Sequence, residues 1–157
     1  MAPKEKPPRT DIVLNRKARF EYEILENFEA GIVLTGSEVK SLRAGKVAIV
    51  DSFAQEQGGQ IWLLSLNIST YKQAHAQNHE PTRPRKLLLH KNQVQKLIGN
   101  TARKGLTLIP LALYFNKRGM VKVDLGLAKG KEKHDKRAAT KDREWDRQKS
   151  RIMKGEK

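Results

Sequence analysis

The sequence predicts a mainly β protein in which roughly six short strands form a small barrel. Three observations lead to this prediction. The apolar segments between residues 20 and 127 are short, turn residues separate them, and expected strands outnumber expected helices. Small β domains with such spacing close into barrels because closure leaves no long strand edge unpaired. We therefore expect an OB-like closed barrel with two or three short helices.

The first expected strand runs from residue 22 to residue 34, and we expect it to bend around residues 30–31. Ser37 is then placed to cap a short helix over residues 38–43, which Gly45 ends. One face of this helix is apolar and suits burial, while its basic side chains stay in water.

The remaining strands are expected over residues 47–55, 60–66, 85–90, 107–115 and 121–127. Gly58 and Gly59 predict a hairpin turn between the first two of these strands. A second helix should follow residue 90 and end at Gly99. Fold class alone does not establish a function, so the function has to come from particular residues.

Composition divides the chain into three zones. Residues 1–19 contain six Lys or Arg, two acids and three Pro, and we interpret them as a mobile basic arm that joins the body near residues 12–14. Residues 20–127 supply the barrel. Residues 128–157 form a basic tail with twelve Lys or Arg against six Asp or Glu.

The tail has little apolar surface, since only Ala138, Trp145 and Ile152 repeat at a spacing of seven residues. Such a stripe is too small to hold an isolated helix. We expect the tail to be disordered when free and helical when bound to phosphates. A simple solvated run of charges is the alternative.

The chain is strongly basic, with 32 Lys and Arg against 17 Asp and Glu in 157 residues, a formal net charge of +15. Nucleic acid is the first candidate partner, because neutralised phosphates release counterions. No apolar run approaches the ~18 residues of a membrane span, and the first ten residues lack the apolar centre of a signal peptide. The absence of Cys gives no support to secretion. We expect a cytoplasmic protein without a membrane partner.

Catalytic motifs are absent: the sequence has no P-loop, no dinucleotide-binding glycine pattern, no zinc-protease helix and no nucleophile elbow. His75 and His79 stand four residues apart, but the proline at position 81 disfavours a helix there. We interpret them as exposed loop histidines and expect no metal and no cofactor. An enzyme is the weakest hypothesis for this chain.

Two stretches of the body suit a folded RNA. Arg83, Arg85 and Lys86 border one expected strand and suit a groove that follows phosphates, with a solvated basic rim as the alternative. The other stretch supplies polar, cationic and stacking groups, namely Asn15, Arg16, Arg19 and Tyr22. Its alternative is a solvated arm that enters a core strand. Because aromatic residues are few, recognition of RNA shape and phosphates is favoured over base stacking.

Several stretches closely resemble the SmpB family. They follow one another along nearly the whole chain: NRKAR at 15–19, FEAGIVLTGSEVKSLRAGK at 28–46, RKLLLH at 85–90, GLAKGK at 126–131, DKR at 135–137 and RIMK at 151–154. The resemblance implies an OB-like barrel that holds the tRNA-like part of transfer-messenger RNA. It also implies a protein that catalyses nothing and acts on ribosomes stalled without a codon in the decoding site.

The resemblance implies further partners and body contacts. The charged form of the RNA, carrying alanine, would arrive with the elongation factor that delivers tRNA, and we expect the protein to be a monomer. Family RNA contacts correspond to Glu29, Leu88 and His90. From composition alone, Glu29 would pair with a nearby Arg, Leu88 would belong to the core, and His90 would cap the following helix.

The tail residues that match the family divide into two groups. Those expected at the decoding centre are Gly130, Lys131, His134, Asp135, Lys136 and Arg137. Those expected in the messenger channel are Lys141, Arg143, Arg147 and Lys149 on phosphates, with Trp145, Ile152 and Met153 on apolar contacts. A general or ribosomal RNA-binding OB-fold protein is the second hypothesis, because it shares the charge but not this tail pattern.

Overall fold

The computed structural model describes residues 9–130, except for the side chains of residues 75–77 and 104. Its strands are β1 (Thr10–Leu14), β2 (Tyr22–Ile32), β3 (Val47–Ala48), β4 (Phe53–Gln57), β5 (Gln60–Leu64), β6 (Asn67–Ile68), β7 (Arg85–Leu88), β8 (Thr107–Phe115) and β9 (Val121–Gly130). Its helices are α1 (Arg16–Glu21), α2 (Gly36–Arg43), α3 (Lys91–Lys104) and the 3₁₀-helix η1 (Lys72–Gln77). The expected mainly β fold with three short α-helices is confirmed for these residues.

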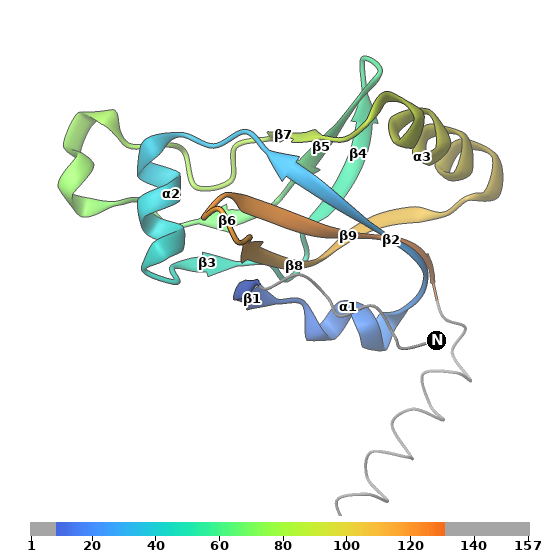
Figure 1. The fold of residues 1–157 in the computed structure, drawn as a ribbon, viewed down its shortest axis with the longest axis horizontal. Helices are drawn as coiled ribbons and strands as arrows, with labels where there is room; N and C mark the ends of the chain where they lie inside the picture. Colours follow the sequence, from blue (N-terminus) through green and yellow to red (C-terminus); the bar gives the residue numbers. More distant parts are fainter. Residues whose placement is uncertain (1–8, 131–157) are drawn as a thin grey trace, which may run out of the picture.

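Seven strands form one antiparallel sheet in the order β1-β8-β4-β5-β7-β2-β9, and β8 also pairs with β9. Strands β3 and β6 form a separate pair. Figure 1 shows α2 at one end of the sheet, α3 at the other, and α1 beside β1 and β8. No helix within residues 9–130 is long and apolar enough to cross a membrane.

The core fills the space between the strands and beneath two of the helices. Leu42 of α2 and Leu97 of α3 are fully buried in the same apolar cluster as Leu63, Leu113 and Val123 of the strands. Complete burial of one such side chain contributes roughly 1.5–3 kcal/mol. The core therefore fixes both helices against the sheet.

The first strand contains the junction between arm and body that we expected near residues 12–14. Residues 10–14 form β1 and pair with β8. Asn15 then caps α1, since its Oδ1 accepts the Ala18 N–H at 3.1 Å and its Nδ2 donates to the Pro110 carbonyl at 3.0 Å. At the other end β9 continues to Gly130, opposite Tyr22.

Other local expectations were met or corrected by tertiary contacts. The hairpin turn at Gly58 and Gly59 is confirmed, with φ of 61° and 79°, values that glycine adopts without strain. Strand β2 pairs with β9 in regular register at residues 30–31, and its register shift lies between Ile24 and Glu26. Helix α3 runs through Gly99 to Lys104.

The N-cap of α2 is Thr35, not Ser37. The Thr35 N–H donates to Glu38 Oε1 at 2.8 Å, and the Glu38 N–H donates to Thr35 Oγ1 at 3.4 Å, which completes a capping box. Ser37 is buried, and its hydroxyl bonds His79 Nδ1 at 2.8 Å. Burial of His79 also corrects our expectation that it is an exposed loop histidine.

A buried ion cluster joins α2 to β7. Glu38 and Arg85 are both fully buried, and the carboxylate accepts hydrogen bonds from Arg85 and from Arg83. Arg85 also donates to the Leu66 carbonyl at 2.7 Å and to the Pro81 carbonyl at 2.9 Å. The cluster therefore links α2, β7 and the chain segments on both sides of residues 69–80.

The cluster keeps Glu38 ionised. Burial opposes ionisation of this carboxyl, but hydrogen bonds from Arg83, from the Thr35 backbone and from Arg85 outweigh it and hold the pKa of Glu38 below its usual 4.5. Burial likewise lowers the pKa of Arg85, and the Glu38 charge opposes that effect. A buried pair of this kind is costly to break, because the remaining charge has no partner.

Replacing Glu38 by Gln should lower the free energy of unfolding by about 3–5 kcal/mol near neutral pH, since two arginines then lose their counter-charge. The folded-state pKa of Glu38 lies below the unfolded value. Its contribution is therefore present above pH 4.5 and is lost as the pH falls through the folded pKa. Denaturant unfolding against pH measures this, with exposed Glu80→Gln as the control. A penalty that does not shrink in acid would contradict the role of the Glu38 charge.

Candidate nucleic-acid interface

Strands β2, β7 and β9 and the start of α3 surround an open cavity of about 300 Å³. Its lining consists of Glu29, Gly31, Leu88, Leu89, His90, Gln93 and Lys122. Antiparallel pairing of Gly31 with Leu88 brings β2 and β7 together at this point. The lining combines an anion, a cation, an imidazole and an apolar side chain, a mixture that suits the varied groups of a folded RNA.

Leu88 is exposed because β7 alternates between two faces. Arg85 and Leu87 point into the core, whereas Leu88 on the outer face is 52% exposed. Its neighbour Gly31 has no side chain, and a Cβ there would lie 3.2 Å from the Leu88 Cβ. Glycine at this position therefore lets the Leu88 side chain lie over β2, and composition alone had placed this leucine in the core.

Tyr114 holds the carboxylate of Glu29. The Tyr114 hydroxyl donates to Glu29 Oε2, and the ring lies beneath the Arg9 guanidinium, 4.5 Å from its central carbon. Burial, with the hydrogen bond to Glu29 and its charge, raises the pKa of Tyr114 far above the usual 10.0. The hydroxyl thus stays protonated and donates throughout the physiological range, in place of the expected ion pair between Glu29 and an Arg.

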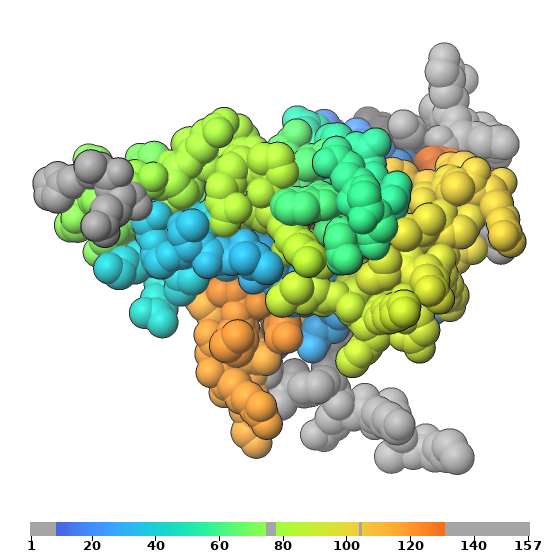
Figure 2. All heavy atoms as spheres, turned by 90° about the horizontal axis from the view of Figure 1, so that it is seen from above, coloured from blue at the N-terminus to red at the C-terminus, as the bar shows by residue number. Residues whose placement is uncertain are grey.

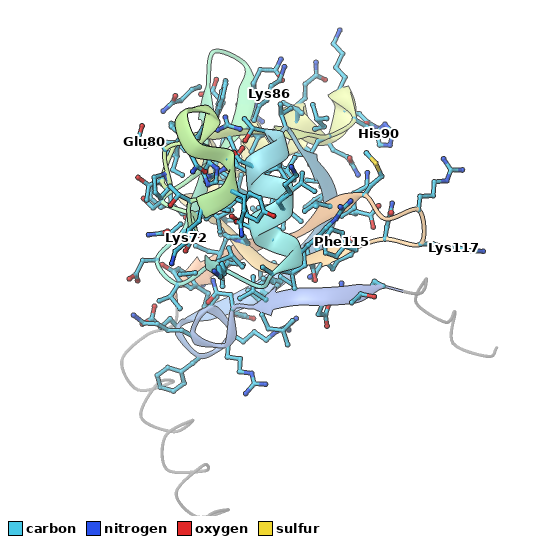
Figure 3. All side chains as sticks on the ribbon, turned by 90° about the vertical axis from the view of Figure 1, so that its left-hand side faces the viewer. Lys72, Glu80, Lys86, His90, Phe115 and Lys117 are labelled. Atoms are coloured by element: carbon cyan, nitrogen blue, oxygen red, sulfur yellow. The ribbon has the colours of Figure 1, made fainter. Side chains whose placement is uncertain are left out.

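His90 occupies the N-cap position of α3. Its backbone N–H donates to Gln93 Oε1 at 3.1 Å, which satisfies one of the free donors at the helix start. The residue is exposed, and Figure 3 shows the side chain at the surface of the molecule. His90 therefore both begins the helix and presents an imidazole beside Leu88.

The sequence profile of the SmpB protein family matches residues 12–155. This chain belongs to the SmpB family. An SsrA-binding protein of Rhodopseudomonas palustris strain BisB18 is 56% identical over 98% of both chains, and one of Afipia carboxidovorans is 54% identical over the same shares. A solved structure named "tmRNA-SmpB: a journey to the center of the bacterial ribosome" matches with a TM-score of 0.65 at 51% identity, covering 82% of this chain and 93% of that chain.

The three body positions taken from the resemblance to the SmpB family line one cavity. Glu29, Leu88 and His90 come from β2, β7 and the start of α3. Lys86 lies on the same outer face of β7 as Leu88 and is half-buried. These four residues are brought together by strand pairing, which their separation along the sequence does not reveal.

Two predicted phosphate contacts of this SmpB family member are corrected. Arg85 is fully buried against Glu38 and has no surface for a phosphate. Arg83 retains 28% of its side-chain exposure, but its guanidinium is bound to Glu38 and to the Val33 carbonyl. Both residues stabilise the fold, because they bind the same carboxylate of α2.

The N-terminal group divides in a similar way. Asn15 is buried as the cap of α1, which leaves it little surface for RNA. Arg16 and Arg19 are exposed on α1, and Tyr22 lines a separate cavity of about 240 Å³ beside that helix. Within residues 9–130, no cluster of His, Asp or Glu is arranged to hold a metal ion.

Gly130, the last described residue, is exposed at the end of β9. The other tail positions carried over from the family lie outside the described residues: Lys131, His134, Asp135, Lys136, Arg137, Lys141, Arg143, Trp145, Arg147, Lys149, Ile152 and Met153. Tyr114 and Gly31 were not predicted to belong to the site. An apolar strand around Tyr114 predicts only burial, and Gly31 gives no sign that its partner is Leu88.

Proposed function

We propose that this chain binds the tRNA-like domain of transfer-messenger RNA and delivers it to stalled ribosomes for trans-translation. The identity of 56% to an SsrA-binding protein over 98% of both chains is the observation that carries the proposal. The chain acts as a binding adaptor and not as an enzyme. Its place of work is then the cytoplasm, where ribosomes translate.

We propose that the RNA binds at the cavity between β2, β7 and α3. Leu88 offers an apolar surface to a ribose or base, and the Glu29 carboxylate accepts hydrogen bonds from base or ribose groups. His90 and Lys86 add polar and cationic contacts at its border. Such a mixed surface favours a folded RNA of one shape over an extended single strand.

The architecture around the cavity is proposed to be an OB-like closed barrel. Pairing of β8 with both β4 and β9 supports closure, because β4, β5, β7, β2, β9 and β8 then each have at least two neighbours. A closed sheet keeps the three segments that carry the RNA contacts in a fixed relation. A monomer with one such barrel would meet the alanyl-charged RNA together with the elongation factor that delivers tRNA.

The tail is proposed to test whether the decoding site and messenger channel are empty. Gly130 and residues 131–137 would lie at the decoding centre, and the following residues would become helical in the channel. Binding there has to supply the free energy that orders the segment. Messenger in the channel excludes the tail, so folding of the tail itself reports the vacancy.

Tyr114→Phe should weaken binding of the tRNA-like domain by about three- to tenfold, because Glu29 loses the donor that orients it. In the background of Glu29→Ala, which removes the acceptor, the same change should have little further effect, and a double-mutant cycle of dissociation constants measures this. Thr101→Val is the control, because it removes a half-buried hydroxyl that bonds the Leu97 carbonyl within α3, outside the cavity lining. Equal losses in both backgrounds, with a parallel drop in thermal stability, would mean that Tyr114 acts on the fold alone.

Deleting residues 131–157 should leave affinity for the isolated tRNA-like domain within about threefold, since the cavity is intact. The same deletion should abolish tagging of the incomplete peptide on stalled ribosomes. Asp135→Ala with Arg137→Ala should likewise impair tagging more than RNA binding. Loss of RNA binding on deletion would contradict the separation of the two tasks.

A further inference from the structure

A second basic surface lies at the end of the molecule where α2 packs. We name it the α2 surface, and it consists of Lys40, Arg43, Lys46, Tyr71 and Lys72. The Lys40 ammonium lies 5.5 Å from the centre of the Tyr71 ring, and the Ser69 N–H donates to the Lys46 carbonyl at 3.1 Å. Figure 3 looks onto this end, with α2 in front and Lys72 beside it.

Two acids, Glu38 and the exposed Glu80, border the two segments that carry the cations of the α2 surface, and none lies within them. Residues 39–48 and 69–79 contain no Asp or Glu. Glu38, the acid of α2, is fully buried and bound to Arg83 and Arg85. All four cations are exposed and none has an ion pair within residues 9–130. Like charges held together in this way repel one another and attract a polyanion.

Side-chain hydrogen bonds fix the segment that carries Tyr71 and Lys72. The Asn78 side chain accepts the Tyr71 N–H at 2.8 Å and donates to the Tyr71 carbonyl at 2.7 Å, which closes the loop over η1. His79 bridges Ser37 Oγ and the Ile68 carbonyl, both at 2.8 Å. The cations are therefore presented on a preformed frame, which lowers the entropy cost of binding.

The segment that leads into α2 is joined to the strand that carries Leu88. Lys86 shares the outer face of β7 with Leu88, and the Lys86 carbonyl accepts the Val33 N–H at 3.0 Å. Val33 is 45% exposed and precedes the cap of α2 by two residues. Figure 2 shows residues 30–45, in blue to cyan, beside the yellow-green segment that contains β7.

We propose that the α2 surface is a second contact for RNA, one that binds the sugar–phosphate backbone of the same molecule that covers Leu88. Lys40, Arg43, Lys46 and Lys72 pair with phosphates, and Tyr71 holds the Lys40 ammonium in place. Phosphate pairing carries no base preference, so this contact adds affinity and orientation rather than sequence choice. The inference rests on the proposed function, because it assigns this surface to the same RNA.

The test compares Lys40→Gln/Lys72→Gln with Lys17→Gln/Arg103→Gln, which removes two charges elsewhere. Both full-length variants are titrated with the isolated tRNA-like domain across a range of salt concentrations, without ribosomes. Loss of phosphate contacts should reduce the slope of log K against log salt by about 0.7–0.9 for each contact. Affinity should fall roughly tenfold in the first variant and less than about twofold in the control.

Equal slopes and affinities in the two variants would overturn the proposal, as would a loss that appears only when ribosomes are added. Thermal denaturation of both variants should match the unchanged chain, because all four side chains are exposed. An unchanged chain that shows no preference for the tRNA-like domain over an unrelated folded RNA is a different result. It would contradict the proposed function and, with it, the shared partner of the α2 surface.

Discussion

The ion cluster of Glu38, Arg83 and Arg85 is the constraint on which the rest of the structure depends. The fully buried Glu38 carboxylate accepts hydrogen bonds from Arg83 and Arg85, which lie 45 and 47 residues further along the chain. Each charge of the cluster stabilises the opposite charge beside it, because an unpaired buried charge is strongly destabilising. The start of α2 and the start of β7 are therefore held in one relation.

That relation determines which residues reach the surface. With Arg85 committed to the interior, strand alternation directs Lys86 and Leu88 outward. Leu88 then meets Gly31 of β2, and Tyr114 and Arg9 support Glu29 at the border of the same cavity. On the other side of the cluster, His79 and Asn78 fix the segment that carries Tyr71. The same buried network thus positions both surfaces that we assign to RNA.

Local signals in the sequence predicted the elements well where local physics decides them. Two glycines specify the hairpin turn, and apolar runs specify β8 and β9. Gly99 did not end α3, because packing of Leu97 and Ile98 on the core outweighs a helix penalty of about 1 kcal/mol. Thr35 and Ser37 are both residue types that favour an N-cap. Ser37 is buried instead, because its hydroxyl hydrogen-bonds His79, which is distant in the sequence.

The candidate site was harder to predict from residue types. A row of cations at residues 83–86 indicates phosphate binding. Two of them instead form ion pairs with a carboxylate that lies far away in the sequence. Asn15 had the composition of an RNA contact but serves as a helix cap. Glu29, Leu88 and His90 came from the family resemblance, since composition favoured an ion pair, a core position and a cap for them.

Amide hydrogen exchange of the free chain tests most directly whether the cluster preforms the RNA surface. The Val33 and Ile68 amides donate to the Lys86 and Pro81 carbonyls on either side of it. We predict that both exchange only by near-global unfolding, with protection that RNA hardly changes. Rapid exchange in the free chain, followed by strong protection once the tRNA-like domain is bound, would contradict a preformed surface.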